Sequence, residues 1–216
     1  MTTWTVLDYG VGNLHSLAKA LTAVGAKVKV TARPEDLAGA DVAVLPGVGA
    51  FGAVMDCLAP AGMALRRRHA DGRPTLGICI GAQVLYAASD ETPGAKGLGI
   101  FPGTVRRLPA SAGKVPHMGW NTLEPAPSGA ASDNPSGLGL QDSLFEGVPA
   151  GSHVYYVHGY AAPVGPETVA STRYGTVFTA ALRQGATVGV QFHPEKSSAV
   201  GRRILANAVR DLEAHA

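Results

Sequence analysis

The chain has 216 residues, of which 46% are hydrophobic and 16% are charged, and its formal net charge at pH 7 is +2. This length favours a single domain over residues 1–216, and the apolar content argues against disorder. The small, scattered charge argues against nucleic-acid binding, while two cysteines are too few for a disulfide scaffold. Without a basic signal region or an apolar stretch of membrane-spanning length, we expect a cytoplasmic protein with no membrane contact.

The first half of the chain alternates between apolar strands and helices. Strands are predicted over Thr3–Leu7, Ala26–Thr31, Asp41–Leu45 and Pro74–Ile78, and helices over Leu14–Val24, Ala50–Arg68 and Gln83–Ala88. Asn13 stands at the N-cap of the first helix, and the run Arg66–Arg68 is expected on a solvated helix face. Such alternation requires right-handed crossovers, so it predicts a mostly parallel central sheet flanked by helices.

After Pro93, short turns replace helices between the predicted strands. These strands cover Leu98–Arg107, Ser152–Val157, Thr168–Tyr174, Thr176–Leu182 and Thr187–Phe192, and we expect them to pair as antiparallel hairpins. Ala126–Gly139 has the composition of a surface loop, and Ser198–Ala214 is predicted to be an amphipathic helix. The fold class is therefore α/β, with antiparallel strands added in the C-terminal half.

Cys79 lies in a G-x-C-x-G segment, Gly77–Gly81, where the fourth strand gives way to its helix. A sharp turn there lifts a nucleophile out of the sheet, and flanking glycines leave room for a strained backbone. The helix N-terminus also favours thiolate over thiol. The segment predicts a nucleophilic cysteine, and the alternative is a buried structural cysteine in an apolar strand.

A nucleophilic cysteine usually needs a general base. Of the seven histidines, His193 has the most suggestive context, because it follows the last strand in Gln191–Glu195. Glu195 can turn back onto the imidazole and fix its tautomer. Cys79, His193 and Glu195 are therefore predicted to be nucleophile, base and orienting residue. The alternative for His193 is a half-exposed residue at a strand end.

The Gly-rich turn Gly47–Gly52 matches the G-x-G-x-x-G pattern of dinucleotide binders. It follows the third predicted strand instead of the first, and the acidic Asp71 precedes a strand instead of following one, which disfavours nucleotide binding. The backbone strip Pro46–Gly49, through the N–H groups that follow Pro46, can instead face the carbonyl attacked by Cys79. Such donors form an oxyanion hole.

Three segments in this order resemble those of the class I, or triad, glutamine amidotransferases: Pro46–Gly49, Gly77–Gln83 and His193–Glu195. Three more are similar to segments of the glutaminase subunits of imidazole glycerol phosphate synthases, from histidine biosynthesis: Asp8–Leu14, Pro116–Asn121 and Tyr155–His158. The resemblance spans the chain from Asp8 to Glu195.

The resemblance implies that Cys79 attacks the side-chain amide of glutamine, that His193 passes the proton to leaving ammonia, and that Glu195 orients His193. Water then hydrolyses a glutamyl thioester. Oxyanion donors are implied at Gly47, Val48 and Ile80, and glutamine-binding positions at Gly49, Gln83 and Tyr160. Gly159 stands where family members often have Ser or Thr, so a hydroxyl contact to glutamine is not expected. We expect neither a cofactor nor a metal.

The resemblance also implies a heterodimer with a TIM-barrel cyclase subunit that consumes the ammonia. Positions expected to face it are Asn13, Trp120, Tyr155 and Lys196, although Trp120 and Tyr155 also suit a core. One alternative is a glutaminase of another synthase, such as the one that makes pyridoxal phosphate, which the segment Pro116–Asn121 argues against. The other is a non-enzymatic binding module, which an intact triad disfavours.

Overall fold

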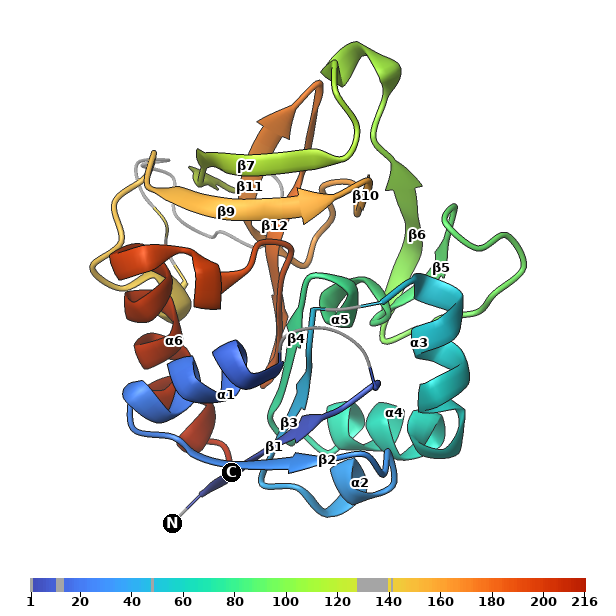
Figure 1. Cartoon of the computed structure of the whole chain (residues 1–216), viewed down its shortest axis with the longest axis vertical. Helices are drawn as coiled ribbons and strands as arrows, with labels where there is room; N and C mark the ends of the chain where they lie inside the picture. The colour runs from blue at the N-terminus through green and yellow to red at the C-terminus, as the bar shows by residue number, and fades with distance from the viewer. Residues whose placement is uncertain (1, 11–13, 48, 128–139, 141) are drawn as a thin grey trace.

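The computed structural model describes residues 2–10, 14–47, 49–127, 140 and 142–216, and its centre is an eight-stranded sheet (Figure 1). The strands, in sheet order, are β2 (Lys27–Thr31), β1 (Thr3–Leu7), β3 (Val42–Leu45), β4 (Thr75–Ile78), β13 (Thr187–Val190), β12 (Thr176–Gln184), β11 (Thr168–Tyr174) and β8 (Glu124–Pro125). The first five pair in parallel, whereas β12, β11 and β8 add antiparallel strands. This confirms the predicted fold class.

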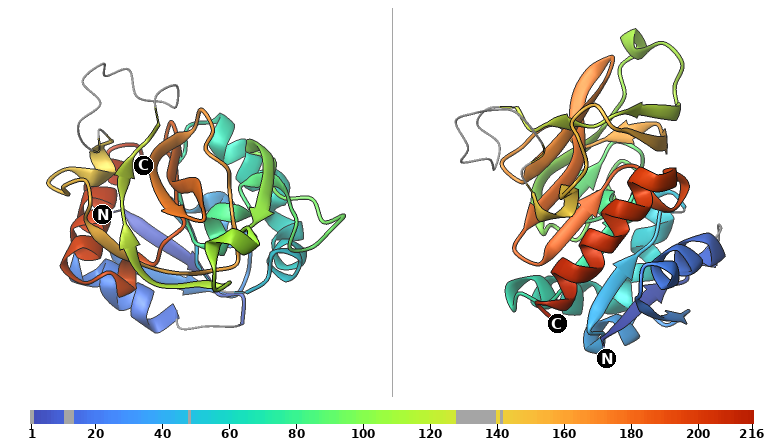
Figure 2. Two further views of the ribbon diagram at one scale, coloured as in Figure 1. Left: turned by 90° about the horizontal axis from the view of Figure 1, so that it is seen from above. Right: turned by 90° about the vertical axis from the view of Figure 1, so that its left-hand side faces the viewer.

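Helices cover both faces of the sheet (Figures 1 and 2). One face carries α1 (Leu14–Ala23) and α6 (Ser198–Glu213), and the other carries α2 (Asp36–Gly39), α3 (Phe51–Leu58) and α4 (Gly62–Ala70). Neighbouring residues of β3 alternate between the two cores: Val44 packs with the α1 and α6 side, and Leu45 with the other side. A strand buried on both faces reads as a continuous apolar run, as β3 does.

Two predicted helices differ from the structure. The helix expected over Ala50–Arg68 is broken by a 3-10 turn, Ala59–Ala61, because Pro60 has no N–H to donate within a helix. The helix expected over Gln83–Ala88 is wrong: α5 covers only Ile80–Gln83, and the chain then forms β5 (Tyr86–Ser89). Pairing of β5 with a later strand overrides the local pattern.

The hairpin prediction holds for part of the second half. β11, β12 and β13 are joined as antiparallel neighbours, but β6 (Phe101–Arg107) runs parallel to β5 and antiparallel to β10 (Tyr160–Ala161). A further strand that the sequence did not indicate, β7 (His117–Thr122), pairs with β9 (His153–His158) in a two-stranded sheet. Asn13 and most of the predicted loop Ala126–Gly139 lie outside the described residues.

Arg68 corrects the expectation of a solvated arginine run. Arg66 and Arg67 are exposed, whereas Arg68 is only 2% exposed. Its guanidinium donates hydrogen bonds to the carbonyl oxygens of Ala40 at 2.6 Å and Pro74 at 2.7 Å. Arg68 therefore ties α4 to the chain entering β3 and β4, and burial lowers its pKa to about 10.

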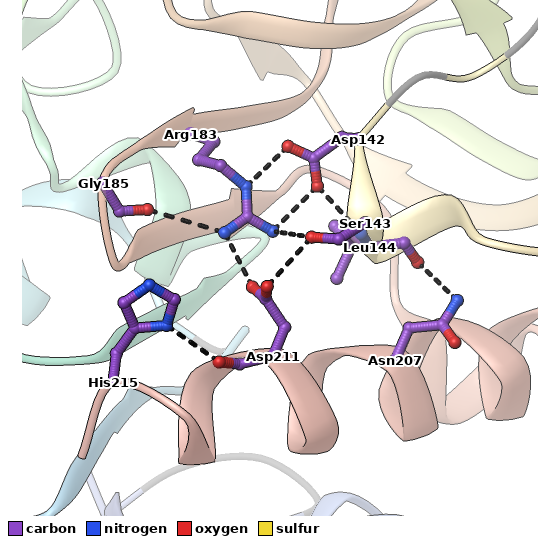
Figure 3. Close-up of polar contacts among 8 residues, drawn as sticks. All are labelled: Asp142, Ser143, Leu144, Arg183, Gly185, Asn207, Asp211 and His215. Carbon is purple, nitrogen blue, oxygen red and sulfur yellow. Dashed lines mark hydrogen bonds and ion pairs between the residues drawn. The ribbon is translucent and has the colours of Figure 1, made fainter.

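A partly buried arginine, Arg183, holds α6 in place (Figure 3). Arg183, at the end of β12, binds Asp142 through two nitrogens, at 2.5 and 2.8 Å, and Asp211 of α6 at 2.7 Å. Ser143 donates a further hydrogen bond to Asp211 at 3.0 Å. This cluster joins the sheet, the 3-10 turn Ser143–Phe145 and α6.

Among the described helices, none is long and apolar enough to cross a membrane.

Candidate active site

Cys79 occupies a strained turn between β4 and α5. Its φ of 49° and ψ of −110° lie outside the regions favoured by residues with a Cβ. The two flanking glycines allow the close approach: a Cβ on Gly77 would lie 2.5 Å from the carbonyl oxygen of Gly81, and one on Gly81 would lie 2.0 Å from that of Leu45. The strained turn expected from the G-x-C-x-G spacing is therefore present.

His193 and Glu195 form a hydrogen-bonded pair directly after β13. Nδ1 of His193 lies 2.8 Å from Oε1 of Glu195, and both side chains are buried, so the half-exposed alternative for His193 is wrong. The carboxylate accepts, so Nδ1 carries the proton and a neutral ring keeps its lone pair on Nε2. Nε2 is buried and has no hydrogen-bond partner among the described residues, so it remains available as a base.

Cys79, His193 and Gly47 come together because β3, β4 and β13 are neighbouring parallel strands. Each of the three residues follows the carboxyl end of one strand, and these ends share one edge of the sheet. A Cβ built on Gly47 would lie 2.8 Å from Cε1 of His193 and 2.9 Å from Cβ of Cys79. The Gly47 backbone thus lies directly against both side chains.

The surroundings of His193 strengthen it as a proton acceptor. Burial lowers the pKa of His193, but its interactions with Cys79 and Glu195 outweigh that effect and raise it to about 9. A base with this pKa can hold the proton that Cys79 gives up near neutral pH. The pair is thus poised for nucleophilic attack.

The sequence analysis missed Gln191 as a neighbour of Cys79. Nε2 of Gln191 lies 3.6 Å from Sγ of Cys79, which is hydrogen-bond distance for sulfur, and Sγ itself lies 3.9 Å from the carbonyl oxygen of Val157. Gln83 donates from Nε2 to Oε1 of Gln191 at 2.9 Å and to the carbonyl oxygen of Tyr160 at 2.8 Å. The sequence carries no local signal for this contact, because Gln191 and Cys79 lie 112 residues apart.

The other positions expected to contact glutamine or its oxyanion lie in several elements. Ile80 is buried and is the first residue of α5, and Gly49 has a φ of 105°. Tyr160 lies in β10, where its carbonyl oxygen also accepts a hydrogen bond from Nδ1 of His158 at 2.8 Å. Val48 lies outside the described residues.

Three of the four positions expected to face a partner form one surface cluster, and the fourth, Asn13, is not described. Trp120 is 52% exposed, which is incompatible with a core role, and its ring meets that of Tyr155 edge-on with centroids 6.1 Å apart. Nζ of Lys196 lies 5.9 Å from the centroid of the Tyr155 ring. The backbone N–H of His193 donates a hydrogen bond to the carbonyl oxygen of Tyr155 at 2.8 Å, so this surface adjoins the predicted triad.

Within the described ranges, no group of three or more His, Cys, Asp or Glu side chains is arranged to hold a metal ion.

Comparisons with known proteins show the family of the chain. The family model described as glutamine amidotransferase class-I matches residues 5–212. The imidazole glycerol phosphate synthase subunit HisH of Microcystis aeruginosa is 43% identical, over 99% of this chain and 97% of that protein. The subunit of the same name from Chloroflexus aurantiacus is 44% identical, over 97% of this chain and 96% of the relative.

Solved structures with little sequence similarity share the fold. PurLQS from Thermotoga maritima superimposes with a TM-score of 0.65 at 16% identity, covering 98% of this chain and 97% of the other. The glutaminase domain of Trypanosoma brucei CTPS gives 0.61 at 13% identity, covering 98% and 95%. The chain therefore belongs to the class-I glutamine amidotransferases and, within them, to the HisH subunits of imidazole glycerol phosphate synthases.

Proposed function

We propose that the chain hydrolyses glutamine to glutamate and ammonia, and that it delivers the ammonia to a cyclase subunit that makes imidazole glycerol phosphate. The observation that carries this proposal is the convergence of Cys79, His193 and Glu195 at one edge of the sheet. The similarity of the whole chain to HisH subunits supports the pathway.

The chemistry follows from the positions of these groups. Sγ of Cys79 attacks the side-chain carbonyl carbon of glutamine, and its proton passes to Nε2 of His193. His193 returns that proton to the departing ammonia, and a thioester remains. Water, deprotonated by the same nitrogen, then releases glutamate and restores the thiol. Glu195 holds the ring in the tautomer that leaves Nε2 free, through the 2.8 Å contact to Nδ1.

Backbone donors support the oxyanion in this scheme. Ile80 begins α5, so its N–H belongs to a helix terminus and points away from intrahelical acceptors. Gly47 and Val48 are proposed to supply the opposing N–H groups, because the Gly47 backbone lies against Cys79. Loss of one such donor typically costs about 3 to 4 kcal/mol of transition-state stabilisation. Gly49, Gln83 and Tyr160 are the proposed glutamine-binding positions.

The partner is proposed to be a TIM-barrel cyclase that forms a heterodimer with this chain. Its proposed contacts are Asn13, Trp120, Tyr155 and Lys196. An exposed Trp beside a Tyr and a cation is typical of an interface anchor. Because the backbone of Tyr155 bonds to His193, docking at this surface adjoins the base of the proposed triad.

The deciding experiment measures ammonia release from glutamine with and without the cyclase subunit and its nucleotide substrate. We expect the cyclase with its bound nucleotide substrate to stimulate ammonia release strongly. The Cys79→Ala variant should release no ammonia above background, yet its complex should still make imidazole glycerol phosphate from added ammonium salt. Wild-type glutaminase activity in Cys79→Ala would contradict the proposed nucleophile, and unstimulated hydrolysis would contradict the proposed partner.

A further inference from the structure

The side chain of Gln191 is buried beside the proposed nucleophile, and its chemistry is not accounted for by the triad. Gln191 follows β13, and its backbone N–H donates to the carbonyl oxygen of Ala180 at 2.8 Å, which fixes its main chain in register with β12. The residue is 4% exposed. Its Nε2 lies 3.6 Å from Sγ of Cys79. A buried amide in this position must find partners for its polar atoms within the protein.

The orientation of this amide is determined by one backbone carbonyl. The oxygen of Tyr160 can only accept, so the Gln83 atom 2.8 Å away is the nitrogen Nε2. The same nitrogen lies 2.9 Å from the side-chain amide of Gln191, which therefore presents its oxygen to Gln83. The nitrogen of Gln191 is then the atom that faces Cys79. Tyr160 also accepts from His158, which holds this carbonyl in place from a second side.

We propose that Gln191 donates a hydrogen bond from Nε2 to the thiolate of Cys79, and that Gln83 holds Gln191 in the donating orientation. The proposal rests on the role of Cys79 as the nucleophile. Gln83 would thus serve the nucleophile as well as the glutamine-binding site proposed above.

The surroundings of Sγ explain why such a donor matters. The carbonyl oxygen of Val157, at 3.9 Å, stabilises the thiol, because it accepts the S–H proton and faces the thiolate with a negative dipole. Cys79 is only 6% exposed, so little water can reach Sγ to donate hydrogen bonds to it. His193, with Glu195 behind it, and the neutral His158 are the titratable groups described around this site. The amide of Gln191 therefore complements His193 as a donor to the charge.

The test is the pH dependence of Cys79 alkylation by iodoacetamide, measured on the full chain by intact mass in a Cys57→Ser background. In Gln191→Met, which keeps a similar volume and loses the donor, the alkylation midpoint should rise by about one pH unit, with an approximately tenfold lower rate below it. Gln191→Glu keeps the acceptor for Gln83 and places a carboxylate near sulfur, so its shift should be at least as large.

The matched control is Asn207→Leu, which removes another buried amide, one that donates to the carbonyl oxygens of Leu144 and Glu146. This variant should be destabilised without any change in the alkylation midpoint. In complex with the cyclase, Gln191→Met should lower kcat with little change in the KM for glutamine, and the loss should shrink as pH rises.

Unchanged midpoints in both Gln191 variants, or shifts matched by Asn207→Leu, would overturn the inference while leaving the nucleophile in place. Full glutaminase activity in Cys79→Ala would instead overturn the proposed function itself. If Gln191→Met does not fold, Gln191→Glu decides the question, because it retains the hydrogen bond from Gln83.

Discussion

Gly47 separates the two side chains on which the proposed chemistry depends. A Cβ at this position would lie 2.8 Å from His193 and 2.9 Å from Cys79, so the imidazole or the thiol must move. Because small displacements of reacting groups cost much of the rate, we expect Gly47→Ala to lower the kcat for glutamine hydrolysis about 100-fold.

The control for this variant is Gly39→Ala, at the end of α2, where a Cβ meets nothing within 4 Å. The measurement is the steady-state rate of glutamate formation in the presence of the cyclase, with folding checked by circular dichroism. Equal rates in the two variants would contradict the placement of Gly47 against the reacting groups.

At the level of single residues, the sequence indicates a feature when local spacing determines it. The G-x-C-x-G turn and the pair His193 and Glu195 follow from residues one or two positions apart. Gln191 and Arg68 do not, because their partners are 112 and 28 residues away, respectively, in Cys79 and Ala40. The role of such a buried polar side chain can be recognised only when the fold shows which distant segment supplies its hydrogen-bond partner.

At the level of elements, the same distinction explains the predictions that were wrong. The parallel strands β1, β3 and β4 are continuous apolar runs, which local sequence indicates well. The segment that becomes β5 is apolar too, but its strand conformation depends on β6, in which Phe101 pairs with Tyr86. The break in the predicted helix over 50–68 has a local cause, because Pro60 interrupts the helical hydrogen bonds. The prediction followed the apolar periodicity of the segment and overlooked this proline.

The junction of β12, the 3-10 turn Ser143–Phe145 and α6 carries a prediction about stability (Figure 3). Arg183→Leu leaves the carboxylates of Asp142 and Asp211 close together, with side chains only 9% and 17% exposed, and without their cation. Breaking a fully buried ion pair from one side costs about 3 to 5 kcal/mol, whereas exposed pairs contribute under about 1 kcal/mol. Because this cluster is partly buried, we expect the free energy of unfolding, measured in urea, to fall by about 2 kcal/mol.

The matched variant is Arg106→Leu, because the Arg106–Asp90 pair is exposed, at 63% and 40%, and such pairs contribute under about 1 kcal/mol. Arg183 lies at the end of the sheet opposite Cys79, since Gln184 pairs with Thr187 at the start of β13. Glutaminase activity of folded Arg183→Leu should therefore be retained. A loss of stability no larger than that of Arg106→Leu would show that the cluster does not hold α6.

At the level of the whole molecule, two buried histidines join the two-stranded sheet to the central one. The His117 ring stacks on Tyr174 of β11, with centroids 4.0 Å apart, and on Tyr156 of β9, at 4.8 Å. Nδ1 of His117 lies 3.1 Å from Nε2 of His158. Because His158 donates from Nδ1 to the Tyr160 carbonyl oxygen, its Nε2 accepts and His117 donates. Both rings are therefore neutral in the folded protein.

This arrangement predicts that the protein loses stability in weak acid. Burial lowers the pKa of His117 to about 4 and that of His158 to about 3. Below the unfolded-state pKa of about 6.5, the unfolded chain binds protons that the folded chain does not, so stability falls as pH decreases. Each histidine contributes up to about 1.4 kcal/mol per pH unit in this range. The raised pKa of His193 affects stability in a different pH range. The contribution of His193 to stability is fully present below pH 6.5 and is lost as pH rises through about 9.

Urea unfolding between pH 4.5 and 7 at constant ionic strength tests this prediction, with His117→Gln as the variant and His153→Gln, an exposed histidine at the start of β9, as the control. The unfolding free energy of His117→Gln should depend less steeply on pH, because unfolding no longer exposes a histidine at position 117 that takes up a proton. His153→Gln should keep the parental slope. His69, whose pKa burial also lowers, adds to that slope in all three proteins. A parental stability that stays constant or rises toward pH 4.5 would show that the buried pair does not control acid unfolding.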